Sequence, residues 1–276
     1  MAGAPLGETT RTTIAVLGAA GRMGGAIIRV LAGAADVALT AAVEHAQSPK
    51  LGLDAGTLAG IGEAGVPISA GPPAAGVASI WIDFSSPSAT ASTAAAAVAA
   101  GAALVVGTTG VTADGKQALA EAARSIPVVF APNTSVGVTA LLRLVADAAR
   151  LLGPDYDLEI VETHHRMKRD APSGTALRLA EALAEATGRD LAKDARYARQ
   201  GDVGPRTQAE IGIQTLRGGD VIGDHTVFFF GQGERIEITH RASSRDTFAR
   251  GAVRAAQWVR GRAPGLYDMR DVLGIR

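Results

Sequence analysis

Groups that carry positive charge and exchange protons are concentrated in one short stretch of the sequence, THHRMKRDAPSGTA at residues 163–176. A histidine gains or loses a proton near neutral pH, and neighbouring cations favour release of a proton from a lysine among them. The stretch therefore offers candidates for general acid–base chemistry. These candidates and the cations beside them are His164, His165, Arg166, Lys168 and Arg169.

The second half of the stretch, Ala-Pro-Ser-Gly-Thr, leads into an amphipathic helix that we predict to end at Gly188. Ser173 and Thr175 are good helix caps, and the amides of Gly174 and Thr175 stand where a helix start offers N–H donors to an anion. With the upstream cations, they predict a receptacle for a small molecule that carries more than one carboxylate. The alternative is a solvated basic loop, which is the usual role of a run of charge.

Metal and thiol chemistry is not indicated. The sequence contains no cysteine, which excludes disulfides, thiolate metal sites and cysteine nucleophiles. His164 and His165 are neighbours on a predicted strand, so their side chains point to opposite faces, and the His-Glu-x-x-His spacing of zinc sites is absent. We therefore predict no metal ion.

The charge of the whole chain balances, with 27 Lys and Arg against 27 Asp and Glu. Such a balance gives no attraction to nucleic acid or to an anionic membrane, so the positive charge at residues 163–176 serves a local purpose. The N-terminal segment MAGAPLGETTRTT lacks the basic and apolar regions of a secretory signal, and we interpret it as a mobile tail. The weakly polar run TASTAAAAVAAGAALVVG predicts a helix and a strand rather than a membrane span.

The first half of the chain alternates short apolar runs with helical patterns. This alternation is typical of βαβ units and predicts a doubly wound, Rossmann-like α/β fold whose parallel sheet is covered on both faces. The expected strands are 13–18, 37–44, 79–85, 103–110 and 126–132, and the expected helices are 22–34, 90–100 and 115–124.

After Asn133 the pattern changes to that of a second, α+β domain with an antiparallel or mixed sheet. Its expected elements are helices at 136–153 and 175–188, a strand at 156–165, a loop at 189–206 and Gly-punctuated strands within 209–242. A final helix within 243–261, capped by Ser243 or Ser244, is expected to return to the first domain. We thus predict a dinucleotide-binding domain at 1–135 plus 245–276, and a substrate-binding and oligomerisation domain at 136–244.

Three glycines follow the first predicted strand in VLGAAGRMGG. Gly18, Gly21 and Gly24 permit a tight turn and close approach of a pyrophosphate to a helix start, and Arg22 can face that anion. The spacing is G-x-x-G-x-x-G instead of the commoner G-x-G-x-x-G, so the alternative is a glycine turn in some other doubly wound protein.

The end of the second strand adds a further sign of nucleotide binding. Glu44 lies twenty residues after Gly24, where an acidic side chain accepts hydrogen bonds from ribose hydroxyls, and the alternative is a solvated strand end. A protonated His45 would meet the 2′-phosphate of NADP, whereas a neutral one would contribute little.

The loops GTTG, APNTSVG and DFSSPSAT follow other predicted strands with small polar residues. Ligands of open α/β sheets bind outside the carboxyl ends of the strands, so residues 107–109 and the backbone of residues 131–134 are expected to wall a nicotinamide. Each loop taken alone could equally be a routine turn or helix cap.

Six segments in order resemble the dihydrodipicolinate reductase family, whose members are also called 4-hydroxy-tetrahydrodipicolinate reductases. They are VLGAAGRMG, GTTG, APNTSVGV, ETHHRMKRDAPSGTA, RGGDVIGDHTVFF and ITHRASSRDTFARGAVRAAQW, and the fourth is the most specific. The resemblance runs from Thr13 to about Leu273. It implies NADH- or NADPH-dependent reduction of 4-hydroxy-tetrahydrodipicolinate to tetrahydrodipicolinate, in the diaminopimelate route of lysine biosynthesis, by a cytoplasmic homotetramer.

The resemblance also implies roles for single residues. His164 would be the proton donor and acceptor, Lys168 a proton donor, and His165 with the amides of Gly174 and Thr175 would hold the substrate carboxylates. Many relatives carry Arg where this chain has His45, which leaves the choice between NADH and NADPH open. The implied cofactor contacts are Gly18, Ala19, Ala20, Gly21, Arg22, Met23, Glu44, Gly107, Thr108, Thr109, Ala131, Pro132, Asn133 and Thr134.

Two other functions are compatible with these motifs. One is a different Rossmann oxidoreductase that acts on another small carboxylate imine, and the other is a nucleotide-sensing protein without catalysis. The pair His164 and Lys168 argues against the second. Self-association is expected as well, because three consecutive phenylalanines at 228–230 make both faces of a strand apolar, and one face needs a partner.

Overall fold

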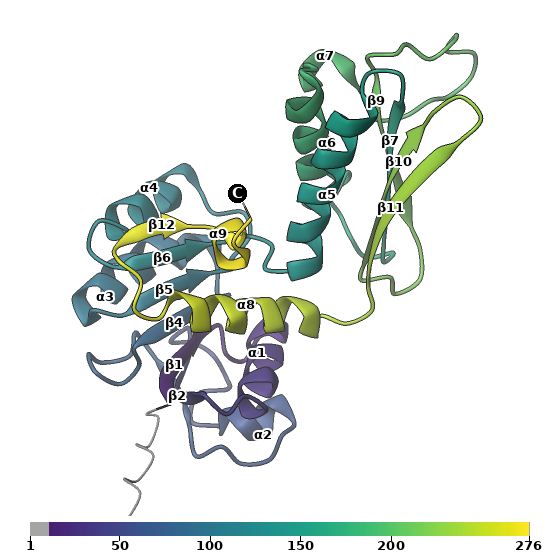
Figure 1. Ribbon diagram of the computed structural model, residues 1–276. Helices are drawn as coiled ribbons and strands as arrows, with labels where there is room; N and C mark the ends of the chain where they lie inside the picture. The colour runs from purple at the N-terminus through teal and green to yellow at the C-terminus, as the bar shows by residue number, and fades with distance from the viewer. Residues whose placement is uncertain (1–10, 276) are drawn as a thin grey trace, which may run out of the picture. The chain divides into compact units, whose positions relative to one another are not determined.

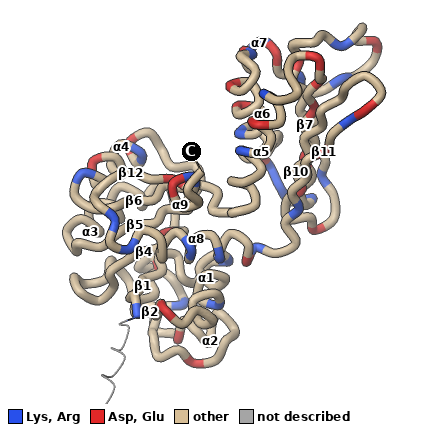
Figure 2. The backbone as a smooth tube through the Cα atoms, in the orientation of Figure 1, with Lys and Arg blue, Asp and Glu red and all other residues tan. Residues whose placement is uncertain are grey.

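The computed structural model describes residues 11–275, and the tail predicted for the first ten residues lies outside this range. The chain divides into two compact units, each built around its own sheet (Figure 1). The first unit extends to Ser135 and resumes at Asp246, and the second spans Val136–Arg245. Charged residues of both signs are spread over both units (Figure 2).

The first unit contains a seven-stranded parallel sheet in the order β12-β6-β5-β4-β1-β2-β3. β4 and β5 are buried along their whole length, as strands covered on both faces must be. Strand order reverses between β1 and β4, and ligands of doubly wound sheets bind at the carboxyl ends of the strands beside such a reversal. The strands are β1 (Thr12–Leu17), β2 (Val37–Glu44), β3 (Ile68–Ala70), β4 (Ile80–Asp83), β5 (Ala103–Val106), β6 (Pro127–Phe130) and β12 (Gly265–Tyr267).

Helices cover both faces of this sheet (Figure 1). Ala97 of α3 and Leu119 of α4 pack with Trp81 and Leu104 of the strands in one apolar core. On the other face α8 contacts β4, β5 and β6 and packs beside α1, so the last long helix does return to the first unit. The helices are α1 (Arg22–Ala32), α2 (Ala55–Ala59), η1 (Pro87–Ala89), α3 (Thr90–Ala100), α4 (Ala113–Ala122), α8 (Asp246–Val259) and α9 (Met269–Leu273).

The second unit contains a mixed five-stranded sheet in the order β11-β10-β7-β9-β8. Helices α5 and α6 cover one of its faces (Figure 1). Burial alternates along β7, so Leu158, Ile160, Glu162 and His164 all point to one side. The elements are α5 (Val136–Leu152), β7 (Asp157–His164), α6 (Gly174–Thr187), α7 (Leu191–Asp194), β8 (Ala195–Arg196), β9 (Ile211–Arg217), β10 (Gly223–Phe230) and β11 (Arg235–Ala242).

The structure corrects the sequence-based assignment at a few places. The segment 189–206 is not all loop, because Asp190 caps α7 and β8 pairs with β9. The helix α8 begins at Asp246, so neither Ser243 nor Ser244 directly precedes it. The elements β3, α2, β12 and α9 went unpredicted because runs of three to five residues show no periodicity. Among residues 11–275, no helix is long and apolar enough to cross a membrane.

Candidate active site

The turn between β1 and α1 is compact because neither Gly18 in the turn nor Gly24 in α1 has room for a side chain. A Cβ on Gly24 would lie 2.2 Å from the carbonyl oxygen of Gly18, and a Cβ on Gly18 would lie 2.6 Å from that of Phe84. Gly18 also adopts a φ of 76°, in the left-handed region that favours glycine. Gly21 directly precedes α1, so the turn delivers the chain straight into the helix start.

The carboxylate of Glu44 is attached to this turn. Its Oε1 accepts a hydrogen bond from the amide of Ala20 at 3.0 Å, and its Oε2 accepts one from the amide of His45 at 3.2 Å. The amides of Gly18 and Ala19 donate to the carbonyl of Val43 nearby. Glu44 is therefore a half-buried link between β2 and the glycine turn and not merely a solvated strand end.

The predicted residues of the turn differ in exposure. Arg22, the first residue of α1, and His45, just after β2, are both exposed, whereas Ala19 is buried. The exposed pair thus borders the turn with two side chains that can face an anion.

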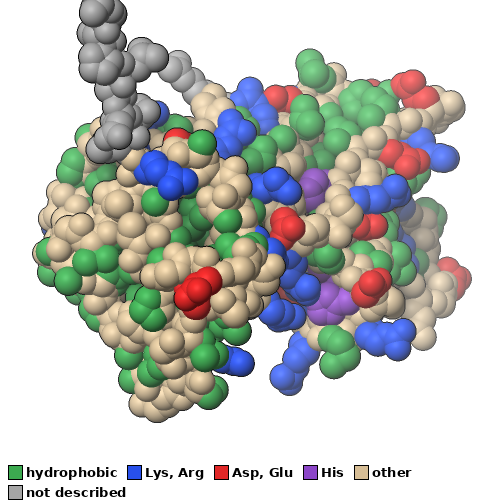
Figure 3. Space-filling view, turned by 90° about the horizontal axis from the view of Figure 1, so that it is seen from below, with side chains coloured by type: hydrophobic (Ala, Val, Ile, Leu, Met, Phe, Trp, Pro, Cys, Tyr) green, Lys and Arg blue, Asp and Glu red, His purple; other side chains and the backbone are tan. Residues whose placement is uncertain are grey.

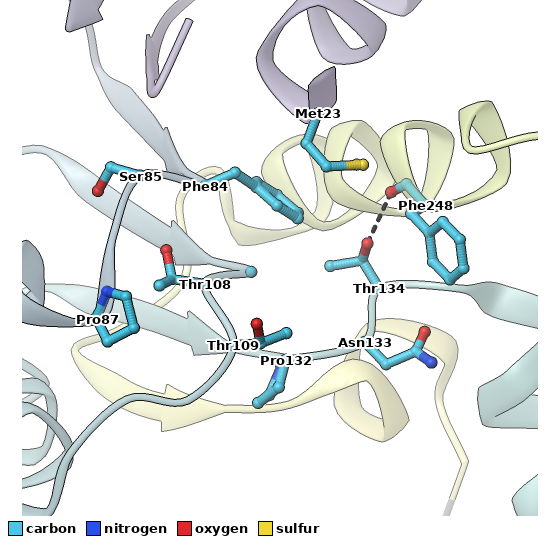
Figure 4. Close-up of a pocket in the computed structure, with 11 residues that line it drawn as sticks. Met23, Phe84, Ser85, Pro87, Thr108, Thr109, Pro132, Asn133, Thr134 and Phe248 are labelled. Carbon is cyan, nitrogen blue, oxygen red and sulfur yellow. Dashed lines mark hydrogen bonds between the residues drawn. The ribbon is translucent and has the colours of Figure 1, made fainter. Parts of the chain in front are cut away.

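A cavity of about 320 Å³ opens beside the carboxyl ends of β4, β5 and β6 (Figure 4). Predicted residues supply much of its wall, and the loop after β4 and helix α8 supply the rest. The predicted lining residues are Met23, Gly107, Thr108, Thr109, Pro132, Asn133 and Thr134, and the further ones are Phe84, Ser85, Pro87 and Phe248. Ala131 is buried behind this wall, where its amide donates to the carbonyl of Val106.

Two of the predicted threonines use their hydroxyls inside the fold. Thr134 donates to the carbonyl of Phe248 at 2.7 Å, the contact drawn in Figure 4, and Thr108 approaches the carbonyl of Asp83 at 3.4 Å. Both side chains are buried, so they shape the cavity wall. Gly107 leaves space for the ring of Phe84, which a Cβ there would meet at 2.0 Å.

Phe248 reaches the cavity from α8, far along the chain. Gly251, one turn later in that helix, lets the helix lie against the loop after β6, because a Cβ on Gly251 would lie 1.7 Å from the carbonyl oxygen of Thr134. The glycine inside a helical pattern was the available sequence signal for such a close approach. Neither Phe248 nor Gly251 was predicted from the sequence as part of the site.

In the second unit, His164 ends β7 and is almost buried. Its Nδ1 lies 2.6 Å from Oε2 of Glu162, and its ring meets that of His225 edge to face at 5.2 Å between centroids. A Cβ on Gly223 would lie 3.0 Å from Nε2 of His164, so the glycine avoids a tight contact with that nitrogen. Figure 3 shows histidine side chains flanked by Lys and Arg side chains on this unit.

Glu162 is fully buried and collects hydrogen bonds from several elements. Arg217 of β9 donates to both of its oxygens, at 2.9 and 3.0 Å. The Oε1 atom also accepts from the amide of Ser173 at 3.0 Å and from the hydroxyl of Thr215 at 3.2 Å. The carboxylate therefore joins β7, β9 and the start of α6.

These surroundings shift the pKa values of the cluster. Burial alone would raise the pKa of Glu162, but the hydrogen bonds from Arg217, His164 and Ser173 outweigh it, and the pKa lies below its usual value. Burial lowers the pKa of His164, although the contact with Glu162 acts in the opposite direction. Burial likewise lowers the pKa of His225, to about 4.

Lys168 has a partner that the sequence analysis did not consider. Its Nζ donates to both carboxylate oxygens of Asp170, at 2.9 and 2.8 Å, and these hydrogen bonds lower the pKa of Asp170. The sequence predicted cations around Lys168, and the structure adds this carboxylate to them. Its backbone amide donates to the carbonyl of His165, whose side chain is half-buried.

The start of α6 follows a cis Ala171–Pro172 peptide bond and is capped as predicted by Ser173. The Ser173 hydroxyl accepts a hydrogen bond from the amide of Ala176. Gly174 and Thr175 are the first two residues of the helix, so Thr175 stands inside it and not at the cap.

The described residues, 11–275, contain no group of three or more His, Asp or Glu side chains that could hold a metal ion.

The cluster around His164 contains more functional groups than the sequence analysis named. Glu162 could have been found, because residues two apart on a strand share a face. Arg217 and His225 could not, because only the pairing of β9 and β10 with β7 brings them to His164.

Comparisons with known proteins agree with this arrangement. The family "Dihydrodipicolinate reductase, N-terminus" matches residues 12–134, and "Dihydrodipicolinate reductase, C-terminus" matches residues 137–273. The 4-hydroxy-tetrahydrodipicolinate reductase of Anaeromyxobacter dehalogenans strain 2CP-1 is 57% identical over 96% of this chain and 98% of its own. That of Syntrophotalea carbinolica is 52% identical over 95% of this chain and 99% of its own.

Among solved structures, a dipicolinate-bound dihydrodipicolinate reductase from Paenisporosarcina sp. TG-14 shares the fold with a TM-score of 0.72. It is 22% identical and covers 94% of this chain and 98% of its own. A probable dehydrogenase from Thermotoga maritima has a TM-score of 0.59 at 12% identity, over 95% of this chain and 93% of its own. The resemblance found in the sequence is confirmed by the family matches over both halves, and the chain belongs to the dihydrodipicolinate reductase family.

Proposed function

We propose that this protein reduces 4-hydroxy-tetrahydrodipicolinate to tetrahydrodipicolinate with NADH or NADPH, using His164 and Lys168 for proton transfer. Family membership makes the chain an oxidoreductase of lysine biosynthesis. The observation that carries the residue assignment is the position of His164, which is almost buried, bonded to Glu162 and directly followed by the basic loop and the start of α6.

The first unit suits a dinucleotide. The glycine turn leaves a cradle that a Cβ at Gly18 or Gly24 would fill, next to the positive end of the α1 dipole. We assign the pyrophosphate to residues 18–23, the adenosine ribose to Glu44 and the nicotinamide to the cavity of Figure 4. Bound NADH or NADPH supplies the hydride. Arg22 and, when protonated, His45 would face the phosphates.

The second unit suits a cyclic dicarboxylate. The amides of Gly174 and Thr175 lie at a capped helix start, where the helix dipole favours an anion. His165, in the turn just before Lys168, would meet a second carboxylate. Two anchors of this kind would orient the ring and draw electron density away from the carbon that accepts hydride.

Proton transfer falls to His164 and Lys168. With the pKa of His164 lowered by burial, its ring is neutral near pH 7, and its bare nitrogen can accept a proton from Lys168 that it then passes to substrate. The ion pair with Asp170 would hold the ammonium of Lys168 in a fixed direction before the transfer.

The direct test is a coupled assay in which a synthase supplies the unstable substrate and NAD(P)H absorbance is followed. We expect substrate-dependent oxidation of both cofactors. Oxidation only with other small carboxylate imines would assign the chain to a different reductase, and cofactor binding without turnover would make it a sensor.

A planar aromatic dicarboxylate, pyridine-2,6-dicarboxylate, provides the matching binding test. It should inhibit competitively with substrate and at least about tenfold more strongly than the monocarboxylate picolinate, since the latter loses one charge-assisted contact. Equal potency of the two acids, or an unchanged dicarboxylate affinity in Lys168→Ala, would remove the 163–176 segment from the substrate site.

We also propose a cytoplasmic homotetramer that assembles through the sheet of the second unit. Phe228 and Phe230 stack at 5.5 Å between centroids on the face of β10 opposite the buried Phe229. Phe230 is 38% exposed. Charged residues of β7 and β11 flank the two rings, since Phe228 pairs with Glu159 and Glu237. Stacked rings left open to solvent in this way would be stabilised by a partner surface.

A further inference from the structure

We propose that Glu162 is a positioning residue of the reaction: it holds the hydrogen of His164 on Nδ1, so that Nε2 is the nitrogen that exchanges protons, and it fixes the start of α6 to the same strand. This inference rests on the proposed role of His164 and adds a residue that does not touch the reacting atoms.

The direction of the hydrogen bond between Glu162 and His164 follows from the other contacts of the carboxylate. Arg217, the hydroxyl of Thr215 and the amide of Ser173 all donate to Glu162. A carboxylate with this many donors is ionised and can only accept. The nitrogen 2.6 Å from it, Nδ1 of His164, must therefore carry the hydrogen.

A neutral imidazole has one N–H, so Nε2 of His164 is then the basic nitrogen. This atom stands on the side of Gly223, where any larger residue would crowd it. The arrangement assigns proton exchange to Nε2 before substrate binds.

The same carboxylate connects His164 to the anion site. Its Oε1 accepts from the amide of Ser173, whose hydroxyl caps α6, and Gly174 follows directly. Arg217 holds Glu162 from β9 and donates a further hydrogen bond to the carbonyl of Asp170 at 2.7 Å. The pair of Glu162 and Arg217 thus sets the position of the histidine and of the helix start together.

Glutamine has the shape of glutamate but cannot replace it here. A glutamine side chain could be oriented in two ways, and in each its NH₂ group would face another donor. That donor would be Arg217 and Ser173 in one orientation and His164 in the other. If the amide turned its NH₂ to Nδ1, the hydrogen of His164 would move to Nε2. The Glu162→Gln variant therefore changes the tautomer while it preserves volume.

The experiment combines histidine ¹⁵N NMR with steady-state kinetics on the full-length protein. In the unmodified protein, without substrate, neutral His164 should show a protonated Nδ1 and a bare Nε2, with the signal assigned by its loss in His164→Gln. In Glu162→Gln we expect a loss or reversal of this tautomer preference. Its kcat should fall about 10²-fold, with the NADH dissociation constant within about twofold of the unmodified value.

Titration adds a readout that a purely structural role would not move. The charged or titratable groups that act on His164 besides Glu162 are Lys168, Arg217 and His225. Without the anion of Glu162, only cations and a histidine remain near the ring, so the pKa of His164 should fall further in Glu162→Gln.

Glu159→Gln is the matched control. Glu159 lies on the opposite face of β7, where it pairs with Arg199 and Arg206, so its loss removes a paired carboxylate from the same strand. Its kcat and the His164 tautomer should not change.

Three results would overturn the inference. They are a protonated Nε2 on neutral His164 in the unmodified protein, an unchanged tautomer in folded Glu162→Gln, or a kcat there within about twofold of normal. If Glu162→Gln does not fold, the tautomer of the unmodified protein decides. If the unmodified protein lacks turnover with the substrate, the proposed function fails, but the tautomer measurement still tests the position of the hydrogen.

Discussion

The hydroxyl of Ser173 lies 2.9 Å from Nε2 of His225, although 52 residues separate the two in the sequence. Both side chains are buried. The hydroxyl accepts a hydrogen bond from the amide of Ala176, and its own hydrogen is then available for His225. The ring of His225 also packs edge to face against His164. The helix start that we assign to the substrate carboxylate is thus supported by a histidine that must stay neutral.

The first prediction concerns acid stability. Burial lowers the pKa of His225 from 6.5 to about 4. At pH values between these two, His225 binds a proton in the unfolded chain but not in the folded chain. Stability therefore falls as pH decreases through this window, by about 3 kcal/mol for this group. In His225→Gln the free energy of unfolding should depend less steeply on pH, as measured by urea titration at several pH values. An unchanged slope in His225→Gln would contradict the assignment.

The second prediction concerns turnover. His164→Gln and Lys168→Ala should each lower kcat by about 10²- to 10⁴-fold with substrate saturating, because each removes a proton-transfer group. NADH affinity, measured by fluorescence titration, should stay nearly the same. Lys193→Ala is the control, since Lys193 also pairs with a nearby aspartate, Asp190, but is 80% exposed at its side chain. Near-normal turnover in either variant would remove that residue from the mechanism.

The third prediction uses two adjacent glycines of α1. Gly24→Ala places a Cβ 2.2 Å from the carbonyl oxygen of Gly18, so the turn must shift, at a cost of about 1–3 kcal/mol in stability. NADH binding should weaken by about tenfold or more. Gly25→Ala meets its nearest atom, Nη1 of Arg29, at 3.7 Å and should raise the melting temperature slightly through helix propensity. Equal NADH affinity in the two variants would show that the turn is not the pyrophosphate site.

The fourth prediction concerns cofactor choice. Both NADH and NADPH should be used, because Glu44 suits a free ribose and His45 directly follows it. His45→Arg should shift the preference towards NADPH, because arginine keeps its charge and can pair with a 2′-phosphate. The measurement is the ratio of kcat/KM values for the two cofactors. An equal ratio in His45→Arg and in the unmodified protein would exclude position 45 from the 2′-phosphate site.

The fifth prediction concerns assembly. Phe230→Glu puts a charge on the open face of β10, next to the ring of Phe228, and should shift the protein to smaller species in sedimentation velocity. Leu151→Glu is the control, because Leu151 lies on α5 in the same unit and is 87% exposed. If the unmodified protein sediments as a monomer at micromolar concentration, it does not associate through this sheet.

Sequence patterns alone determined the class of fold and much of the first unit. The strand 37–44 and the helix 90–100 were predicted with the bounds that the structure has. Periodicity is strong there because parallel strands are apolar throughout and their helices are about ten residues long. Glycine spacing likewise pointed to the β1–α1 turn, since a close approach of backbone atoms restricts the residue type at Gly24 directly.

Tertiary structure decided which groups surround each predicted residue. Asp170 was visible beside Lys168 in the sequence, but only the folded loop turns its carboxylate onto the ammonium. Arg217 and His225 lie on β9 and β10, whose pairing with β7 is a long-range property with no local signal. The charge and hydrogen position of His164 depend on these neighbours through burial and hydrogen bonding. The residue types therefore identified the chemistry. The groups that set the charge and hydrogen position of His164 come together only when strands far apart in the chain pair in the folded protein.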